Sequence, residues 1–98
     1  MATPSAPDDL AVSHDEGAHR FETLVNGQLS ICEYELRGNE MVFTHTFVPS
    51  ELRGRNIAQK LVQVALHWAQ SKQLRVVPAC SYVAAFIARR PEFQVLVK

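Results

Sequence analysis

Val48-Pro49-Ser50-Glu51-Leu52-Arg53-Gly54-Arg55-Asn56-Ile57-Ala58 is the stretch that decides the fold of this chain. The strand pattern before it ends at Pro49, because proline cannot donate to a strand ladder. The basic turn after it opens the longest helical pattern in the sequence, from about residue 55 to residue 71. Backbone N–H groups at a helix start lack an acceptor within the helix and carry the positive end of its dipole. Arginines beside such donors make a site suited to phosphate.

The residue types of the turn fit this interpretation. Gly54 and Ala58 are small, and Asn56 tolerates the left-handed region better than most side chains. Close approach of a phosphate to backbone donors needs such residues. The alternative is a helix start that is basic without binding anything.

Composition narrows the class of protein. A chain of 98 residues with 47% hydrophobic residues and no net charge is typical of one small globular domain. The charge balance argues against a general nucleic-acid binder. Two cysteines are too few for a disulfide framework, and no metal-ligand spacing is visible. With no signal-peptide pattern and no apolar run of membrane-spanning length, we expect a cytoplasmic monomer or weak dimer.

Before the basic turn, the pattern predicts three antiparallel strands over residues 20–25, 28–37 and 40–48. Asn26-Gly27 and Gly38-Asn39 are two-residue hairpin signals, which pair Val25 with Gln28 and Arg37 with Glu40. Counting back with a period of two puts one set of residues on the core face of the sheet. That set is Phe21, Cys32, Tyr34, Leu36, Met41, Phe43, His45 and Phe47, with Cys32 and His45 as cross-strand neighbours.

After the turn, a helix with one apolar stripe leads to a short strand at residues 74–77, which we expect to run parallel to the third strand. Ser81 then caps a second helix over residues 82–89, and Phe93 to Val97 reads as an extended segment. The predicted fold class is α+β: an antiparallel meander, a helix, a parallel strand and a second helix. Residues 19–98 form this domain, and residues 1–18 form a flexible tail whose last residues can still join the first strand.

Two further side chains are candidates for chemistry. Cys80 lies where the parallel strand ends and a helix begins, a place that lowers the pKa of a thiol. His45 on a core-facing row is a candidate proton acceptor near neutral pH. The structural alternative for both is core packing, which is the commoner fate of a free cysteine.

The element order and several short motifs resemble the GNAT-type N-acetyltransferases. Arg53, Asn56 and Ala58 occupy the three defined places of the acetyl-CoA signature Gln/Arg-x-x-Gly-x-Gly/Ala. More narrowly, the chain resembles the small GNAT-like family that includes N-acetyltransferase domain-containing protein 1. The matching motifs are Arg20-Phe21-Glu22, His45-Thr46-Phe47-Val48-Pro49, Glu51-Leu52-Arg53-Gly54-Arg55, Pro78-Ala79-Cys80-Ser81-Tyr82-Val83 and Arg90-Pro91-Glu92-Phe93.

This resemblance implies a minimal GNAT fold that binds CoA or acetyl-CoA. The pantetheine arm then lies along Phe47 and Val48, where the third strand splays from the parallel strand. The pyrophosphate faces the backbone of Arg53, Gly54, Arg55, Asn56, Ile57 and Ala58. Because Asn56 replaces the usual glycine, we expect weakened CoA binding, not its loss.

The resemblance also implies acetyl transfer to an amine acceptor that the sequence does not identify. Either an amine attacks acetyl-CoA directly with His45 taking the proton, or Cys80 accepts the acetyl group first. A full-length GNAT enzyme has N-terminal helices that this chain lacks, so we expect an acceptor groove that is open or completed by another chain. The alternative function is a non-catalytic CoA-binding or protein-interaction module on the same fold.

Overall fold

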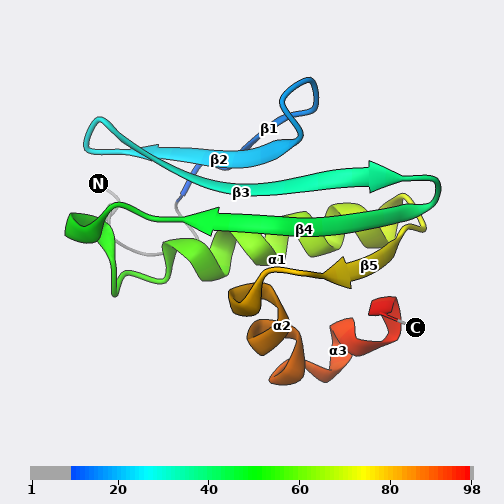
Figure 1. The fold of residues 1–98 in the computed structure, drawn as a ribbon. Helices are drawn as coiled ribbons and strands as arrows, with labels where there is room; N and C mark the ends of the chain where they lie inside the picture. Colours follow the sequence, from blue (N-terminus) through cyan, green and yellow to red (C-terminus); the bar gives the residue numbers. More distant parts are fainter. Residues whose placement is uncertain (1–9, 98) are drawn as a thin grey trace.

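A computed structural model describes residues 10–97 and shows a five-stranded sheet in the order β1-β2-β3-β4-β5. The strands are β1 (Ser13–Asp15), β2 (Arg20–Val25), β3 (Gln28–Arg37), β4 (Glu40–Phe47) and β5 (Arg75–Pro78). Neighbours are antiparallel except for β4 and β5, which are parallel. With the helices added, this is the α+β architecture of a minimal GNAT fold, so the predicted fold class is confirmed (Figure 1).

The two hairpin turns set the register of the meander as predicted. Val25 pairs with Gln28, and Arg37 pairs with Glu40. Asn26 and Gly27 have φ of 53° and 75°, which is the type I′ pattern. At the second turn only Gly38 has a positive φ, of 61°, which is the type II′ pattern. The turns differ in type but give the same two-residue connection.

A β-bulge in β4 changes which of its residues face the core, compared with the prediction. Tyr34 pairs with Phe43 but Glu33 pairs with His45, so Thr44 is an extra residue without a partner in the ladder. Beyond the bulge the alternation of β4 is inverted. Cys32 therefore lies opposite Thr46, not His45. The predictions that His45 and Phe47 face the core and that Cys32 neighbours His45 were wrong.

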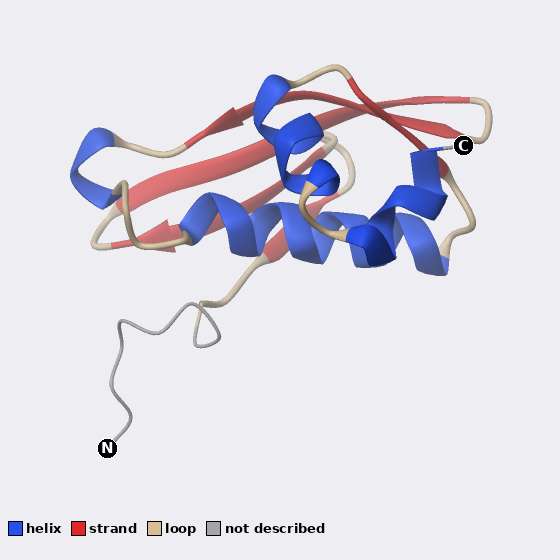
Figure 2. Ribbon diagram, turned by 90° about the horizontal axis from the view of Figure 1, so that it is seen from below, coloured by secondary structure: helices blue, strands red, loops and turns tan. Residues whose placement is uncertain are grey.

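Helix α1 (Ile57–Ser71) covers one face of the sheet and supplies much of the core. Its apolar stripe buries Leu61, Ala65 and Leu66 completely against Phe21 and Phe43 from the sheet. In both ribbon views α1 lies across that face of the sheet (Figures 1 and 2). Burial of each large apolar side chain is worth roughly 1.5–3 kcal/mol. The start of α1 is thus fixed relative to the end of β4.

The C-terminal part differs from the prediction of an extended segment. Helix α2 (Ser81–Ala88) has Cys80, not Ser81, as its N-cap residue. It is followed by α3 (Pro91–Gln94) and the 3₁₀ turn η3 (Val95–Val97). Pro91 at the first helical position favours a helix start, and Phe93 is buried against the His67 ring. Tertiary burial of Phe93 therefore outweighs the apparent strand pattern.

Strand β1 lies in the region predicted as a tail, so the sheet begins before residue 19. Its inward residue, His14, is opposite Phe21 and stacks on that ring with centroids 3.9 Å apart. The His14 ring also meets Trp68 edge-on at 4.6 Å, and its Nε2 is 2.6 Å from the Tyr34 hydroxyl oxygen. Burial lowers the pKa of His14, although Glu16 and Asp15 oppose this effect. Residues 1–9 lie outside the described part of the chain.

We expect His14 to make folding pH-sensitive. Because its pKa in the folded protein is below 6.5, protonation favours the unfolded state, and stability falls as pH drops from about 7.5 to about 5.5. Urea unfolding at both pH values should show a larger loss for the wild type than for His14→Phe, which keeps a ring but cannot titrate. His45→Gln, at an exposed histidine, should behave like the wild type. Parallel losses in the wild type and His14→Phe would contradict this role.

Candidate functional site

The edge of β4 is open where its pairing with β5 stops. The last pair in the parallel ladder is Phe43 with Pro78, and the Cys80 N–H then donates to the Phe43 carbonyl at 2.9 Å. Pro78 has no N–H to continue the ladder, and the chain turns into α2. Strand β4 continues to Phe47 with β3 as its only neighbour. Backbone groups beyond Phe43 on this edge are therefore not paired with β5.

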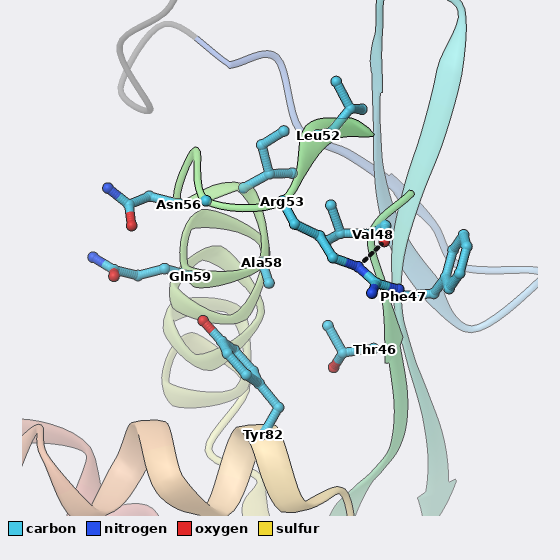
Figure 3. Close-up of a pocket in the computed structure, with 11 residues that line it drawn as sticks. Thr46, Phe47, Val48, Leu52, Arg53, Asn56, Ala58, Gln59 and Tyr82 are labelled. Atoms are coloured by element: carbon cyan, nitrogen blue, oxygen red, sulfur yellow. Dashed lines mark hydrogen bonds between the residues drawn. The ribbon is translucent and has the colours of Figure 1, made fainter. Parts of the chain in front are cut away.

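The basic turn begins with the 3₁₀ turn η2 (Ser50–Leu52), which is anchored by the buried Leu52. The Nε–H of Arg53 donates to the carbonyl of Val48 at 2.9 Å and ties the turn to the end of β4 (Figure 3). Gly54 and Asn56 have φ of 85° and 61°, in the left-handed region. Asn56 thus adopts a conformation that asparagine tolerates better than most residue types.

The first turn of α1 leaves backbone donors for a ligand. The Lys60 N–H donates to the Asn56 carbonyl at 3.1 Å, so Ile57, Ala58 and Gln59 precede the first intrahelical bond. The Asn56 side chain makes no capping hydrogen bond, and the first turn contains no acidic residue. No side chain of α1 therefore neutralises the positive end of its dipole, which suits an anion.

A cavity of about 390 Å³ lies between the start of α1, the end of β4 and α2. This volume is in the range of small-molecule sites. Its lining residues are Thr46, Phe47, Val48, Leu52, Arg53, Gly54, Asn56, Ile57, Ala58, Gln59 and Tyr82. Of the residues predicted to bind a cofactor, all except Arg55 are in this set. Arg55 is exposed on the same turn.

Figure 3 shows how the lining side chains are directed. The Thr46 side chain lies on the same side of β4 as Tyr82, whereas the Phe47 ring lies on the opposite side. Phe47 is 43% exposed, so it borders the cavity through its backbone. The Asn56 and Gln59 side chains point away from β4.

Sequence reasoning missed Tyr82 and assigned Thr46 to the wrong face. Tyr82 was only the first residue of an expected helix, and its hydroxyl in fact points toward the start of α1 (Figure 3). Burial raises the pKa of Tyr82, with an opposing effect from Arg89. The phenol therefore stays protonated at neutral pH and can donate a proton. The helical period of α2 was the available signal for Tyr82, but no local signal reveals the bulge that turns Thr46 inward.

Cys80 lies next to the cavity, with its Sγ 3.6 Å from the Thr46 Oγ1. Burial raises the pKa of Cys80, but hydrogen bonds from the Val83 and Tyr82 backbone and from Thr46 outweigh it. The net result is a pKa below that of an ordinary thiol. Cys80 is thus a partly exposed thiol whose thiolate form is stabilised at a helix start.

The other two candidates have different environments. Cys32 is fully buried, and burial raises its pKa to about 12, so it remains a thiol. His45 is exposed on the outer side of β4, opposite Glu33, and does not line the cavity. The cavity therefore brings together the basic turn, Thr46, Tyr82 and the neighbouring Cys80, without His45. Within residues 10–97, no three His, Cys, Asp or Glu side chains are grouped to hold a metal ion.

We predict that the left-handed conformation of Asn56 is tolerated by only a few residue types. Asn56→Ala should lower the free energy of unfolding by about 1 kcal/mol, because a Cβ without a compensating polar group is strained at positive φ. Asn56→Gly, the matched control, should be at least as stable as the wild type. Urea denaturation measures both, and an alanine variant as stable as the glycine variant would show that the turn adopts another conformation.

Comparison with known proteins agrees with this geometry. The model of the GCN5-related N-acetyl-transferase family matches residues 20–96. Protein NATD1 of Bos taurus is 34% identical over 96 residues, covering 92% of this chain and 85% of the relative. Protein NATD1 of Danio rerio is 32% identical over 90 residues, with 89% and 82% covered, and that of Homo sapiens is 31% identical over 85 residues, with 84% and 75% covered. None of the helices in the described region is long and apolar enough to cross a membrane. The chain belongs to the GCN5-related N-acetyltransferase family.

Proposed function

We propose that this protein is an acetyl-CoA-dependent N-acetyltransferase that transfers an acetyl group to an amine. The single observation that carries the proposal is the cavity that joins the unbonded amides of α1 to the open edge of β4. One end of this cavity suits a diphosphate, and the other end lies beside a thiol of lowered pKa. An elongated molecule with phosphate at one end and a thioester at the other fits both.

The residues present suit CoA at each part of the cavity. The backbone N–H groups of Gly54 to Gln59 supply donors for the pyrophosphate, and Arg53 adds positive charge. A Cβ built at Gly54 would meet nothing within 4 Å, so this part of the turn is uncrowded. The open edge of β4 at Thr46 to Val48 offers backbone groups to the amides of the pantetheine arm.

The nucleophile in this proposal is the Cys80 thiolate. Acetyl-CoA is a substrate that supplies an acetyl group activated as a thioester. The thiolate attacks the acetyl carbonyl carbon, a C–S bond to Cys80 forms, and the C–S bond to CoA breaks. The protonated Tyr82 hydroxyl lines the cavity and is suited to give its proton to the departing sulfur.

In the second half of the reaction a neutral amine attacks the acetyl carbon on Cys80. A C–N bond forms and Cys80 leaves as a thiolate. The amine nitrogen loses its proton to water, and a proton from water restores the Tyr82 hydroxyl. Direct attack of the amine on acetyl-CoA is the other route. The orientation of His45 away from the cavity favours the route through Cys80.

The second candidate function is a CoA-binding or protein-interaction module without turnover. The same cavity supports it, because the binding features do not depend on Cys80. Turnover separates the two functions: a module binds CoA but gives no acetylated amine.

Titration with CoA should perturb the amide signals of residues 46–48 and 53–59 in a two-dimensional NMR spectrum. Arg53→Glu should raise the Kd on the order of tenfold, since it replaces a favourable charge with a repulsive one and frees the end of β4. Arg37→Glu, a charge reversal at an exposed arginine of the distant β3–β4 hairpin, is the matched control and should bind like the wild type. No shifts at about 1 mM CoA would remove the basis of the proposal.

Incubation with acetyl-CoA alone should add one acetyl group to the protein, because no amine is present to discharge it. Intact mass measurement followed by peptide mapping should locate the group on Cys80. Cys80→Ala should bind CoA with unchanged Kd but remain unmodified and lose transfer to a panel of amines. Full transfer by Cys80→Ala would instead assign the reaction to direct attack.

A further inference from the structure

We infer that Thr46 is a positioning residue whose hydroxyl donates a hydrogen bond to the Cys80 sulfur and favours its thiolate form, and that the β-bulge of β4 turns Thr46 toward Cys80. The inference rests on the proposed function, because it concerns the same thiol. It assigns a specific role to a side chain that the sequence pattern placed on the outer face.

The first observation is the place of Thr46 in the sheet. With unbroken alternation on β4, His45 would face the core and Thr46 would face outward. The unpaired Thr44 inverts this order, so that Thr46 lies opposite the buried Cys32. Thr46 also lies beyond the last β4–β5 pair, on the part of β4 that borders the cavity. The bulge therefore puts a hydroxyl, instead of an imidazole, at the end of β5.

The second observation is the contact itself. The Thr46 Oγ1 is 3.6 Å from the Cys80 Sγ, within hydrogen-bond range for sulfur. A thiolate only accepts hydrogen bonds, so with Cys80 ionised the Thr46 hydroxyl must be the donor. A hydrogen bond from the Thr46 backbone also lowers the pKa of Cys80. Thr46 thus approaches Cys80 from β4 while the amides of Tyr82 and Val83 approach it from α2.

The third observation is the group on the other side of Thr46. Thr46 lies opposite Cys32 in the β3–β4 ladder, and Cys32 is fully buried in the core. Burial raises the pKa of Cys32 to about 12, so this neighbour stays neutral. Cys32 therefore does not compete with Cys80 as an anion for the proton of the Thr46 hydroxyl.

The test is the pH dependence of Cys80 alkylation by iodoacetamide in the full chain without CoA. Cys32 is fully buried and should not be alkylated, and peptide mapping checks this. Thr46→Val keeps the shape of the side chain but removes the hydroxyl. It should shift the alkylation profile to higher pH and lower the rate at pH 7 by about three- to tenfold. Thr46→Ser restores a hydroxyl and should react nearly like the wild type.

Thr44→Val is the matched control, because it makes the same chemical change at the exposed bulge residue two positions away. Its alkylation profile should coincide with that of the wild type. Identical profiles for Thr46→Val and the wild type, with the fold intact by NMR, would overturn the inference. Identical alkylation profiles would say nothing against CoA binding. Conversely, a wild type that does not bind CoA would overturn the proposed function but not the role of Thr46 in the alkylation of Cys80.

Discussion

The site depends on two changes at one level of the sheet: β4 loses β5 as a neighbour, and its pairing with β3 contains a bulge. Its parallel pairing with β5 ends at Phe43, and its antiparallel pairing with β3 is interrupted by the unpaired Thr44 immediately afterwards. Backbone polar groups need a partner in the protein, in water or in a ligand. Beyond Phe43, therefore, β4 offers one edge to a ligand and turns a different set of side chains toward the core. The cavity and the contact between Thr46 and Cys80 both follow from this local break.

Helix α1 holds the basic turn in place next to the end of β4. Leu52 and Ile57 are buried on either side of the basic turn, so the turn is fixed although most of its residues are exposed. At the far end, the rings of Trp68, Phe21 and His14 tie the helix to β2 and β1. Burial along the length of α1 holds its first amides where they meet the end of β4.

The two cysteines have the same side chain, but their environments shift the pKa values of their thiols in opposite directions. Cys32 lies inside the core, where burial alone dominates and the thiol stays protonated. Cys80 is only partly buried and receives hydrogen bonds from α2 and from β4, which stabilise its charged form. Titratable groups whose environments push their pKa values apart commonly mark a reaction site. Thr46 is opposite Cys32 in the sheet, and its hydroxyl oxygen is 3.6 Å from the Cys80 sulfur, so it lies where the two environments meet.

The sequence alone determined the register of the meander at its two turns and the helix that follows the basic turn. It also determined where prolines end strands, and it placed at the basic turn an asparagine that tolerates the left-handed conformation found there. These features depend on residues within a few positions of one another. The tertiary structure alone decided that His45 faces outward and Thr46 inward, because a bulge depends on pairing with both neighbouring strands. It also decided the strand at Ser13–Asp15 and the helix at Pro91–Gln94, where short segments take their conformation from the surface that buries His14 and Phe93.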